Sequence, residues 1–360
     1  MLKGRILLTG GGTAGHIWPV IAIGEALKSN TRLKILYIGS NSGPEKKIAK
    51  NFQIPFKGIV VGKWRNYFSL LNFWDILKTF LGIIQAFFIL IFFKPNVIFA
   101  KGGYVTFPIL FWAKMFKTSV VIHESDLIMG KANRWAGNFA KKICLGFPVK
   151  YYSGLNLPMA KIVYTGTPVR REFFGKVPVS RERPTLLVTG GSQGSAAINQ
   201  KLSEILPELV KNYDIYHLAG EKDYPNLKEK FSHPNYHLIS FTEDMAHLMR
   251  NADLIISRAG ANTLAEISAL GKPSILIPLP SAHLDHQEAN AKVFESQNAA
   301  VVVSEKNLTG SAFLSIINRL MEEESLRQLL GHHAQEFSRK EATSEIIDIL
   351  FEVGAQNGKK

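Results

Sequence analysis

Short apolar runs alternate with helical patterns along the whole chain, which is typical of βα units and parallel sheets. In the first half, the pattern predicts strands near residues 5–9, 33–38, 58–61, 96–100, 118–122, 142–145 and 161–165. In the second half, it predicts strands near residues 185–189, 214–218, 236–240, 253–257, 274–278 and 300–303, followed by helical segments from about 310 to 353. The sequence therefore predicts an α/β fold with two doubly wound, Rossmann-like domains that face each other across a cleft.

Each half opens with a strand, a glycine loop and the start of a helix. The apolar run Ile6–Leu8 is followed by Gly10, Gly12 and Gly15, and the second half repeats this order with Thr185–Thr189 and the stretch GGSQGSAAIN. Glycines let a ligand approach the backbone, and free N–H groups at a helix start favour an anion. Both loops are therefore predicted to bind phosphate groups.

The first glycines also fit G-x-G-x-x-G, a spacing found in nicotinamide sites. Such a site needs an acid after the second strand to bind the ribose. Here Leu33–Ile38 runs into GSNSG, and the first acid is Glu45. His16, directly behind the last glycine, also has no role in hydride transfer. The pattern therefore disfavours a dehydrogenase.

The length of 360 residues suits two domains. A stretch rich in proline and charge predicts a linker at residues 167–183, between a first domain at 1–166 and a second at 184–335. Residues 336–360 are expected to form a C-terminal helix that packs back on the first domain.

Composition and charge limit the cellular compartments and the kinds of partner that suit this protein. The single cysteine, Cys144, rules out an intrachain disulfide and fits a reducing compartment, and the N-terminus lacks the long apolar core of a signal peptide. Residues 1–170 hold 23 Lys and Arg against 5 Asp and Glu, whereas residues 171–360 hold 20 against 24. A basic half suits an anionic membrane surface or a polyanionic substrate. No recognisable nucleic-acid motif accompanies it, so no nucleic-acid partner is expected.

Residues 74–93, WDILKTFLGIIQAFFILIFF, are almost entirely apolar. Only 15 residues separate Lys78 from Lys94, and Gln85 interrupts them. This is short of the roughly 20 residues that a membrane-spanning helix needs. Two interpretations remain, a buried or domain-packing helix, or a helix that lies in the membrane interface. In the second, the side chains that contact the membrane would be Trp64, Trp74, Phe80, Phe87 and Phe88.

Several polar residues follow predicted strands, where open α/β sheets bind ligands. His16 lies at a helix start, where the local field favours a neutral imidazole, so it either acts as a general base or caps the loop. The HESD stretch at 123–126 and the loop Lys101–Tyr104 reach the same edge, although each also fits a plain turn. Arg170 is a candidate cation for a diphosphate, and Glu266 either binds a ribose or compensates a helix dipole.

His283, Asp285 and His286 match no standard zinc spacing, and the chain has no Asp-x-Asp pair to hold a divalent ion on a nucleotide. The sequence therefore predicts no catalytic metal.

Seven motifs together resemble the MurG family, the membrane-associated N-acetylglucosaminyltransferases of peptidoglycan synthesis. They are, in chain order, GGGTAGHIWP, KGGYVTFP, HESD, GTPVR, GGSQGS, SRAGANTLAE and DHQEANA. The resemblance implies a glycosyltransferase-B fold and transfer of GlcNAc from UDP-GlcNAc to the MurNAc C4 hydroxyl of undecaprenyl-diphosphoryl-MurNAc-pentapeptide (lipid I), which gives lipid II with inversion. It implies no cofactor and no tightly bound metal. The first domain would bind the acceptor at the membrane, and the second would bind UDP-GlcNAc.

The resemblance also implies residue roles. His16 and Asp126 would be catalytic. UDP-GlcNAc would be bound by Thr13, Ala14, Gly15, Asp126, Arg170, Ser192, Thr242, Glu266, Gln287 and Glu288, and the acceptor diphosphate by Gly12, Thr13, Lys101, Gly102, Gly103 and Tyr104. The chain departs from the family pattern at Asp126 and Thr167, where many members have Asn, and at Ala14, where Gly is common. His16 would be the favoured general base. Asp126 would accept a hydrogen bond from a sugar hydroxyl, and as alternatives it would share the base role with His16 or take it over.

The implied setting is the cytoplasmic face of the cell membrane, with a peripheral enzyme that serves cell-wall growth, shape and division. Its partners would be lipid I, the anionic membrane surface and wall-synthesis or division proteins. Three alternatives stay open: a transferase acting on diacylglycerol, a non-catalytic sugar-nucleotide sensor at the membrane, and a sugar-nucleotide epimerase on the same fold.

Overall fold

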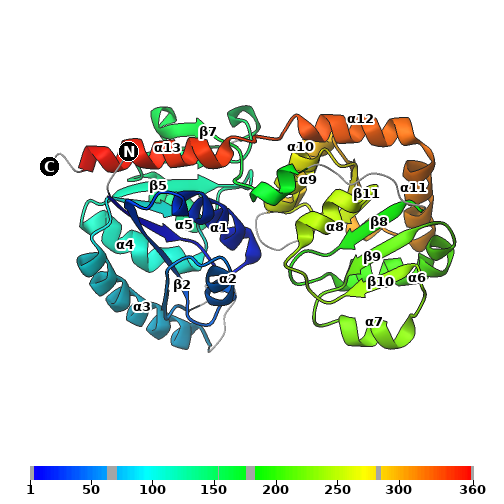
Figure 1. The fold of residues 1–360 in the computed structure, drawn as a ribbon, viewed down its shortest axis with the longest axis horizontal. Helices are drawn as coiled ribbons and strands as arrows, with labels where there is room; N and C mark the ends of the chain where they lie inside the picture. Colours follow the sequence, from blue (N-terminus) through cyan, green and yellow to red (C-terminus); the bar gives the residue numbers. More distant parts are fainter. Residues whose placement is uncertain (1–3, 63–70, 153, 176–182, 281–284, 358–360) are drawn as a thin grey trace. The chain divides into compact units, whose positions relative to one another are not determined.

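The computed structural model of the chain describes residues 4–62, 71–152, 154–175, 183–280 and 285–357. The chain divides into two compact units, Met1–Arg170 with Arg339–Lys360, and Arg171–Ser338. Each unit contains one parallel sheet with helices on both faces (Figure 1). This confirms the predicted α/β class with two doubly wound units.

The sheet of the first unit has seven strands within the described residues, all parallel, in the order β3-β2-β1-β4-β5-β6-β7. The strands are β1 (Gly4–Thr9), β2 (Leu33–Ser40), β3 (Phe56–Ile59), β4 (Val97–Ala100), β5 (Ser119–Glu124), β6 (Lys142–Leu145) and β7 (Ile162–Tyr164). The helices are α1 (Ala14–Lys28), α2 (Glu45–Asn51), α3 (Leu71–Phe93), α4 (Phe107–Met115), α5 (Lys131–Gly137) and α13 (Ala342–Asn357).

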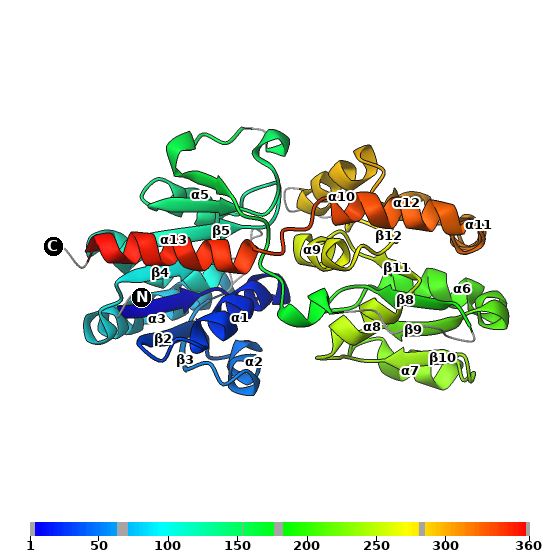
Figure 2. The same ribbon diagram turned by 45° about the horizontal axis from the view of Figure 1, so that its top comes forward.

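Side chains of this sheet alternate between two buried faces, as expected for strands covered on both sides. Leu7 and Ile98 pack with α3 and α4 in one cluster. Ile6 and Leu8 pack on the other face with α1 and with Ile346 of α13. Figures 1 and 2 show α13 lying along this sheet, so the end of the chain completes the core of the first unit.

The sheet of the second unit has six parallel strands within the described residues, in the order β10-β9-β8-β11-β12-β13. The strands are β8 (Thr185–Thr189), β9 (Asp214–Leu218), β10 (Tyr236–Ile239), β11 (Leu254–Ser257), β12 (Ser274–Leu276) and β13 (Val301–Val302). The helices are α6 (Ala196–Asn212), α7 (Tyr224–Lys230), α8 (Met245–Asn251), α9 (Ala261–Leu270), α10 (His286–Ser296), α11 (Gly310–Glu322) and α12 (Glu324–Gln335).

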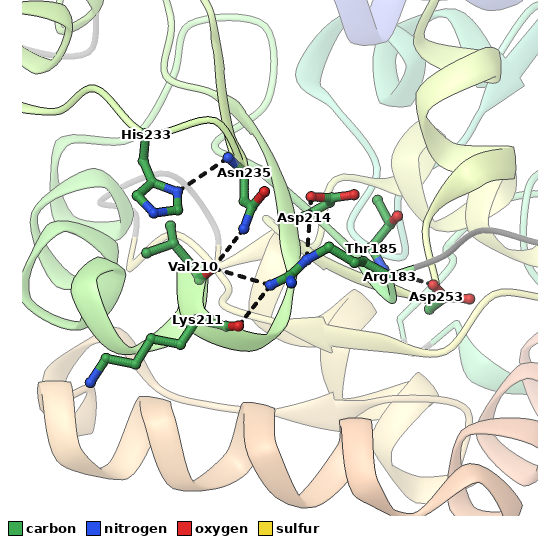
Figure 3. A network of polar contacts seen from close by, with 8 residues as sticks. All are labelled: Arg183, Thr185, Val210, Lys211, Asp214, His233, Asn235 and Asp253. Atoms are coloured by element: carbon green, nitrogen blue, oxygen red, sulfur yellow. Dashed lines mark hydrogen bonds and ion pairs between the residues drawn. The ribbon is translucent and has the colours of Figure 1, made fainter.

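A network of polar contacts surrounds the C-terminal end of α6 (Figure 3). It lies at the opposite edge of the sheet from the second glycine loop, which precedes α6. Arg183 donates to the carbonyl oxygens of Lys211 at 2.7 Å and Val210 at 3.2 Å. A cation at this position satisfies the last carbonyls of the helix and its negative dipole end. Asp253 accepts the N–H of Thr185 at 2.7 Å and so fixes the start of β8.

Some boundaries differ from the predicted ones. The third strand covers 56–59 instead of 58–61 because the N–H of Val60 donates to the side chain of Gln85 and leaves the ladder. The fifth strand extends to Glu124, so His123 and Glu124 belong to the sheet. Residues 171–174, expected within the linker, form a 3₁₀ turn whose Phe173 is buried in the second unit.

Candidate functional site

The first glycine loop joins β1 to α1 at the carboxyl edge of the first sheet. Gly12 has a φ of 90°, a conformation that favours glycine. Thr13, the N-cap residue, makes no side-chain hydrogen bond to the helix. The first turn of α1, all of whose residues the structure describes, contains no Asp or Glu. The start of α1 therefore has the electrostatic character of an anion site.

Three loops lie at this edge because β1, β4 and β5 are neighbours in the sheet. The strand order reverses between β1 and β4, which is where doubly wound sheets bind ligands. A Cβ on Gly103 would clash with the carbonyl oxygen of Gly11 and lie 3.0 Å from Cδ2 of His16. Only glycine fits here, so the loop after β4 lies directly against the first glycine loop and the ring of His16.

Tyr104 packs against Gly12, since a Cβ on Gly12 would clash with the tyrosine ring. Burial raises the pKa of Tyr104, and the carboxylates of Glu45 and Asp75 raise it further. The hydroxyl therefore stays protonated near neutral pH and can donate a hydrogen bond.

Lys101 is only 1% exposed and lies near Glu124 and Asp126. Burial lowers the pKa of Lys101, and the two carboxylates oppose this shift. Burial also raises the pKa of Glu124, against the effect of Lys101. The lysine thus links the loops after β4 and β5 by charge, and its predicted contact with the acceptor diphosphate stays a prediction.

Glu124 organises the loop that carries Asp126. Its Oε1 accepts the N–H of Asp126 at 3.2 Å, and its Oε2 accepts from Gly130 at 2.9 Å and from Asn133 at 3.1 Å. Asp126 itself is half-buried. Sequence reasoning missed this role of Glu124, because its partners only become visible once the loop is folded.

His123 serves the structure of the sheet. Burial, helped by Lys101, lowers its pKa to about 3, so the ring is neutral. Its Nε2 lies 2.9 Å from the carbonyl oxygen of Gly166 and donates to it. His16 and Asp126 remain the two base candidates of the first unit.

Arg170 is 5% exposed, and its guanidinium carbon lies 4.1 Å from the ring centroid of Trp18 in α1. This is cation–π stacking, which orients the planar guanidinium. The predicted contact of Arg170 with the UDP diphosphate stays a prediction.

The second glycine loop joins β8 to α6. Gly191 has a φ of 84°, and a Cβ there would meet no described atom within 4 Å, so this side of the loop is open. Ser192 is exposed beside it. Ser195 is the N-cap of α6, and its Oγ accepts from Ile198 at 3.4 Å.

Arg258 ties the loops of the second sheet together. The guanidinium donates to Ser195 Oγ at 2.6 Å and to the carbonyl oxygens of Ile277 and Pro278 at 3.1 and 3.3 Å. It also lies 2.5 Å from a carboxylate oxygen of Glu305. Its place directly after a buried strand was the only signal in the sequence, and no role was predicted for it.

The other residues predicted to bind UDP-GlcNAc follow the carboxyl ends of strands in the second sheet. Thr242 follows β10, and its Oγ1 accepts the N–H of Asp244 at 3.0 Å. Glu266 lies in the second turn of α9 and is half-buried. Gln287 accepts the N–H of Leu279 at 3.0 Å.

Glu288 is exposed in α10 and pairs with Lys292 at 3.4 Å. His283 lies outside the described residues, whereas Asp285 and His286 start α10. Within the described ranges, no group of three or more His, Cys, Asp and Glu side chains is arranged to hold a metal ion.

An apolar surface covers α3 of the first unit. Trp74, Phe80 and Phe88, three of the predicted membrane contacts, are 62%, 60% and 51% exposed. Phe87 is only half exposed and packs on Trp112 of α4, with ring centroids 4.7 Å apart. The fifth predicted contact, Trp64, lies outside the described residues.

By length and composition, Phe73–Phe93 is one helix among the described residues that could cross a membrane, and 22% of its most apolar window is buried. This low burial disagrees with the interpretation of α3 as a buried helix.

Each of the two α/β units has a glycine loop at the carboxyl edge of its parallel sheet, and each unit matches a known family of domains. The glycosyltransferase family 28 N-terminal domain matches residues 6–145, and the family 28 C-terminal domain matches residues 185–346. The protein is therefore a glycosyltransferase of family 28.

Individual relatives narrow the family further. The UDP-N-acetylglucosamine–N-acetylmuramyl-(pentapeptide) pyrophosphoryl-undecaprenol N-acetylglucosamine transferase of Clostridium kluyveri is 38% identical, over 96% of this chain and 98% of the relative. The enzyme of the same name from Clostridium perfringens is 40% identical, over 89% and 91%. The crystal structure of Acinetobacter baumannii MurG matches with 25% identity and a TM-score of 0.73, over 97% and 99%. The chain belongs to the MurG family.

Proposed function

We propose that this protein transfers GlcNAc from UDP-GlcNAc to the C4 hydroxyl of MurNAc in undecaprenyl-diphosphoryl-MurNAc-pentapeptide, and so converts lipid I to lipid II with inversion. The observation that carries this proposal is near-full-length similarity to relatives named for that reaction. The first unit binds the lipid-linked diphosphate and the second unit binds the sugar nucleotide.

His16 is the proposed general base. It lies in the first turn of α1, where the helix dipole favours a neutral imidazole that can accept a proton. His16 takes the proton of the C4 hydroxyl while that oxygen bonds to the anomeric carbon of GlcNAc. The bond from this carbon to the β-phosphate oxygen breaks, and UDP leaves with the electron pair. Asp126 accepts from the acceptor hydroxyls and is the alternative base.

Departing UDP carries negative charge, which fixed donors stabilise. In this proposal the open loop at Gly191–Ser192 and the start of α6 provide those donors, with Arg170 as the cation. The other residues proposed to contact UDP-GlcNAc are Thr13, Ala14, Gly15, Thr242, Glu266, Gln287 and Glu288. The acceptor diphosphate is held by Thr13 and by Lys101, Gly102, Gly103 and Tyr104.

The test is UDP release from UDP-GlcNAc by purified protein, without added metal, with either a lipid I analogue or diacylglycerol. Release only with the lipid I analogue is expected. His16→Ala should lower kcat about 10²- to 10⁴-fold without weakening UDP-GlcNAc binding, while the exposed His233→Ala should have no effect. Release with diacylglycerol would point to the rival transferase. Donor binding without release would favour a sensor.

We also propose that the exposed face of α3 rests on the cytoplasmic membrane without crossing it. The side-chain oxygen of Gln85 accepts the backbone N–H of Val60 at 2.7 Å, and the indole N–H of Trp112 donates to the carbonyl oxygen of Ile83 at 2.8 Å. The guanidinium of Arg5 donates to the carbonyl oxygen of Phe93 at 2.9 Å. A helix whose second half, residues 83–93, is bonded to its own domain cannot also span lipid, but its exposed apolar face can insert at headgroup depth. Exposed Lys78 lies in α3 and exposed Lys94 directly follows it, and in this proposal both meet lipid phosphates.

A further inference from the structure

Glu45 is fully buried beside the first glycine loop. Its Oε1 accepts the N–H of Gly12 at 2.6 Å. Its Oε2 is also buried and has no hydrogen-bond partner among the described residues. Burial of a carboxylate is unfavourable unless its oxygens are satisfied, so a half-satisfied one breaks a rule of stable packing. Departures of this kind concentrate at functional sites.

The backbone closes tightly around this carboxylate. A Cβ on Gly11 would clash with Oε1, and a Cβ on Gly43 would clash with Oε2. Two glycines from different loops therefore leave just enough space for the side chain. The fit confines the carboxyl group to the position in which it bonds Gly12.

The hydrogen bond between Glu45 and Gly12 fixes a loop that contacts the loop after β4, next to the proposed base His16. Gly12 lies against the ring of Tyr104, and the carbonyl of its neighbour Gly11 lies against Gly103, where an added Cβ would also come within 3.0 Å of Cδ2 of His16. A shift of the loop would therefore move both the loop after β4 and the ring of His16.

We propose that Glu45 is a positioning residue, whose carboxylate holds the loop Gly10–Thr13 in the shape that binds the acceptor diphosphate and orients His16. The inference rests on the proposed function of that loop. It also changes the predicted part of Gly12, because the single N–H of this glycine is donated to Glu45. In this proposal Gly12 provides only the backbone conformation of the loop, and the backbone N–H groups from Thr13 onward donate hydrogen bonds to the acceptor diphosphate.

The test compares Glu45→Ala with Glu45→Gln. The glutamine keeps an oxygen that can accept from Gly12, whereas alanine removes it. Glu45→Ala should lower kcat/KM for the lipid I analogue about 10- to 100-fold, the cost of losing a bond to a charged group. Glu45→Gln should recover most of this loss.

Asp253→Ala is the matched control, since it removes a carboxylate-to-backbone bond of similar length, at the start of β8. It should lower the unfolding temperature without changing acceptor kinetics. Equal losses in Glu45→Gln and Glu45→Ala, or full activity of Glu45→Ala, would overturn the positioning role.

Hydrogen exchange of residues 10–16 separates this inference from the proposed function. Exchange should be faster in Glu45→Ala than in Glu45→Gln or wild type, even if the wild-type protein turned over no lipid I analogue. Unchanged exchange in Glu45→Ala would contradict the inference directly, whereas an inactive wild type would contradict only the proposed function.

Discussion

His217 illustrates how buried partners fix a single protonation state. Its Nε2 lies 2.9 Å from Oδ1 of Asn199, and its Nδ1 lies 2.8 Å from the hydroxyl of Tyr236. The amide nitrogen of Asn199 donates to Asp223 and to the carbonyl of Ala219, so its Oδ1 can only accept. Nε2 of His217 therefore carries the proton and Tyr236 donates to Nδ1. The network joins α6, just behind the second glycine loop, to the residues after β9.

Acid should weaken the second unit through this group. Burial lowers the pKa of His217 to about 4, below its ordinary value of 6.5. A folded-state pKa below the unfolded one gives stability that is complete above about pH 6.5 and is lost as the pH falls toward 4. The group should cost the folded state about 3 kcal/mol between pH 7 and pH 4.

Denaturant unfolding with hydrogen exchange of β8 and β9 would measure this loss. His217→Gln should flatten the pH dependence, whereas the exposed His233→Gln should keep the wild-type slope. The same slope in all three proteins would contradict the protonation state assigned to His217.

At the scale of elements, strands were predictable because each is a short apolar run that the sheet buries. The glycine loops were predictable too, because their backbone conformation requires glycine and several glycines directly after a strand are visible in the sequence. The residues that hold these loops were not, because their partners are distant along the chain. Glu45 lies 33 residues from Gly12, and Arg258 lies 63 residues from Ser195. In the sequence, Glu45 was only the first acid after the second strand.

The exposed face of α3 should govern membrane binding. The triple variant Trp74→Ser, Phe80→Ser and Phe88→Ser removes apolar side chains worth roughly 2 kcal/mol each when fully buried in lipid. Binding to anionic vesicles should fall at least about 10-fold while the unfolding temperature stays within a few degrees. Phe87 is left intact because it packs on Trp112.

Leu329→Ser provides the control for this variant, since Leu329 is 47% exposed in the second unit. It should leave vesicle binding unchanged. If the triple variant bound vesicles as tightly as wild type, α3 would not be the membrane surface.

For the whole molecule, the charge follows the two structural units. The excess of Lys and Arg lies in residues 1–170, while residues 339–360, which complete the first unit, hold four basic and four acidic side chains. The unit that is strongly basic is also the one that carries the exposed face of α3 and the proposed acceptor loops. This division of charge suits a first unit that works on a lipid-linked diphosphate at an anionic surface.

The most direct test of this account is the structure of the product formed by purified protein from UDP-GlcNAc and a MurNAc-diphosphoryl-lipid. Mass spectrometry would show whether one GlcNAc is added, and the anomeric coupling in proton NMR would show its configuration. We expect a single GlcNAc on the MurNAc C4 oxygen with the configuration inverted relative to the donor. A retained configuration, a glycosylated diacylglycerol or an epimerised donor without a lipid product would contradict the account.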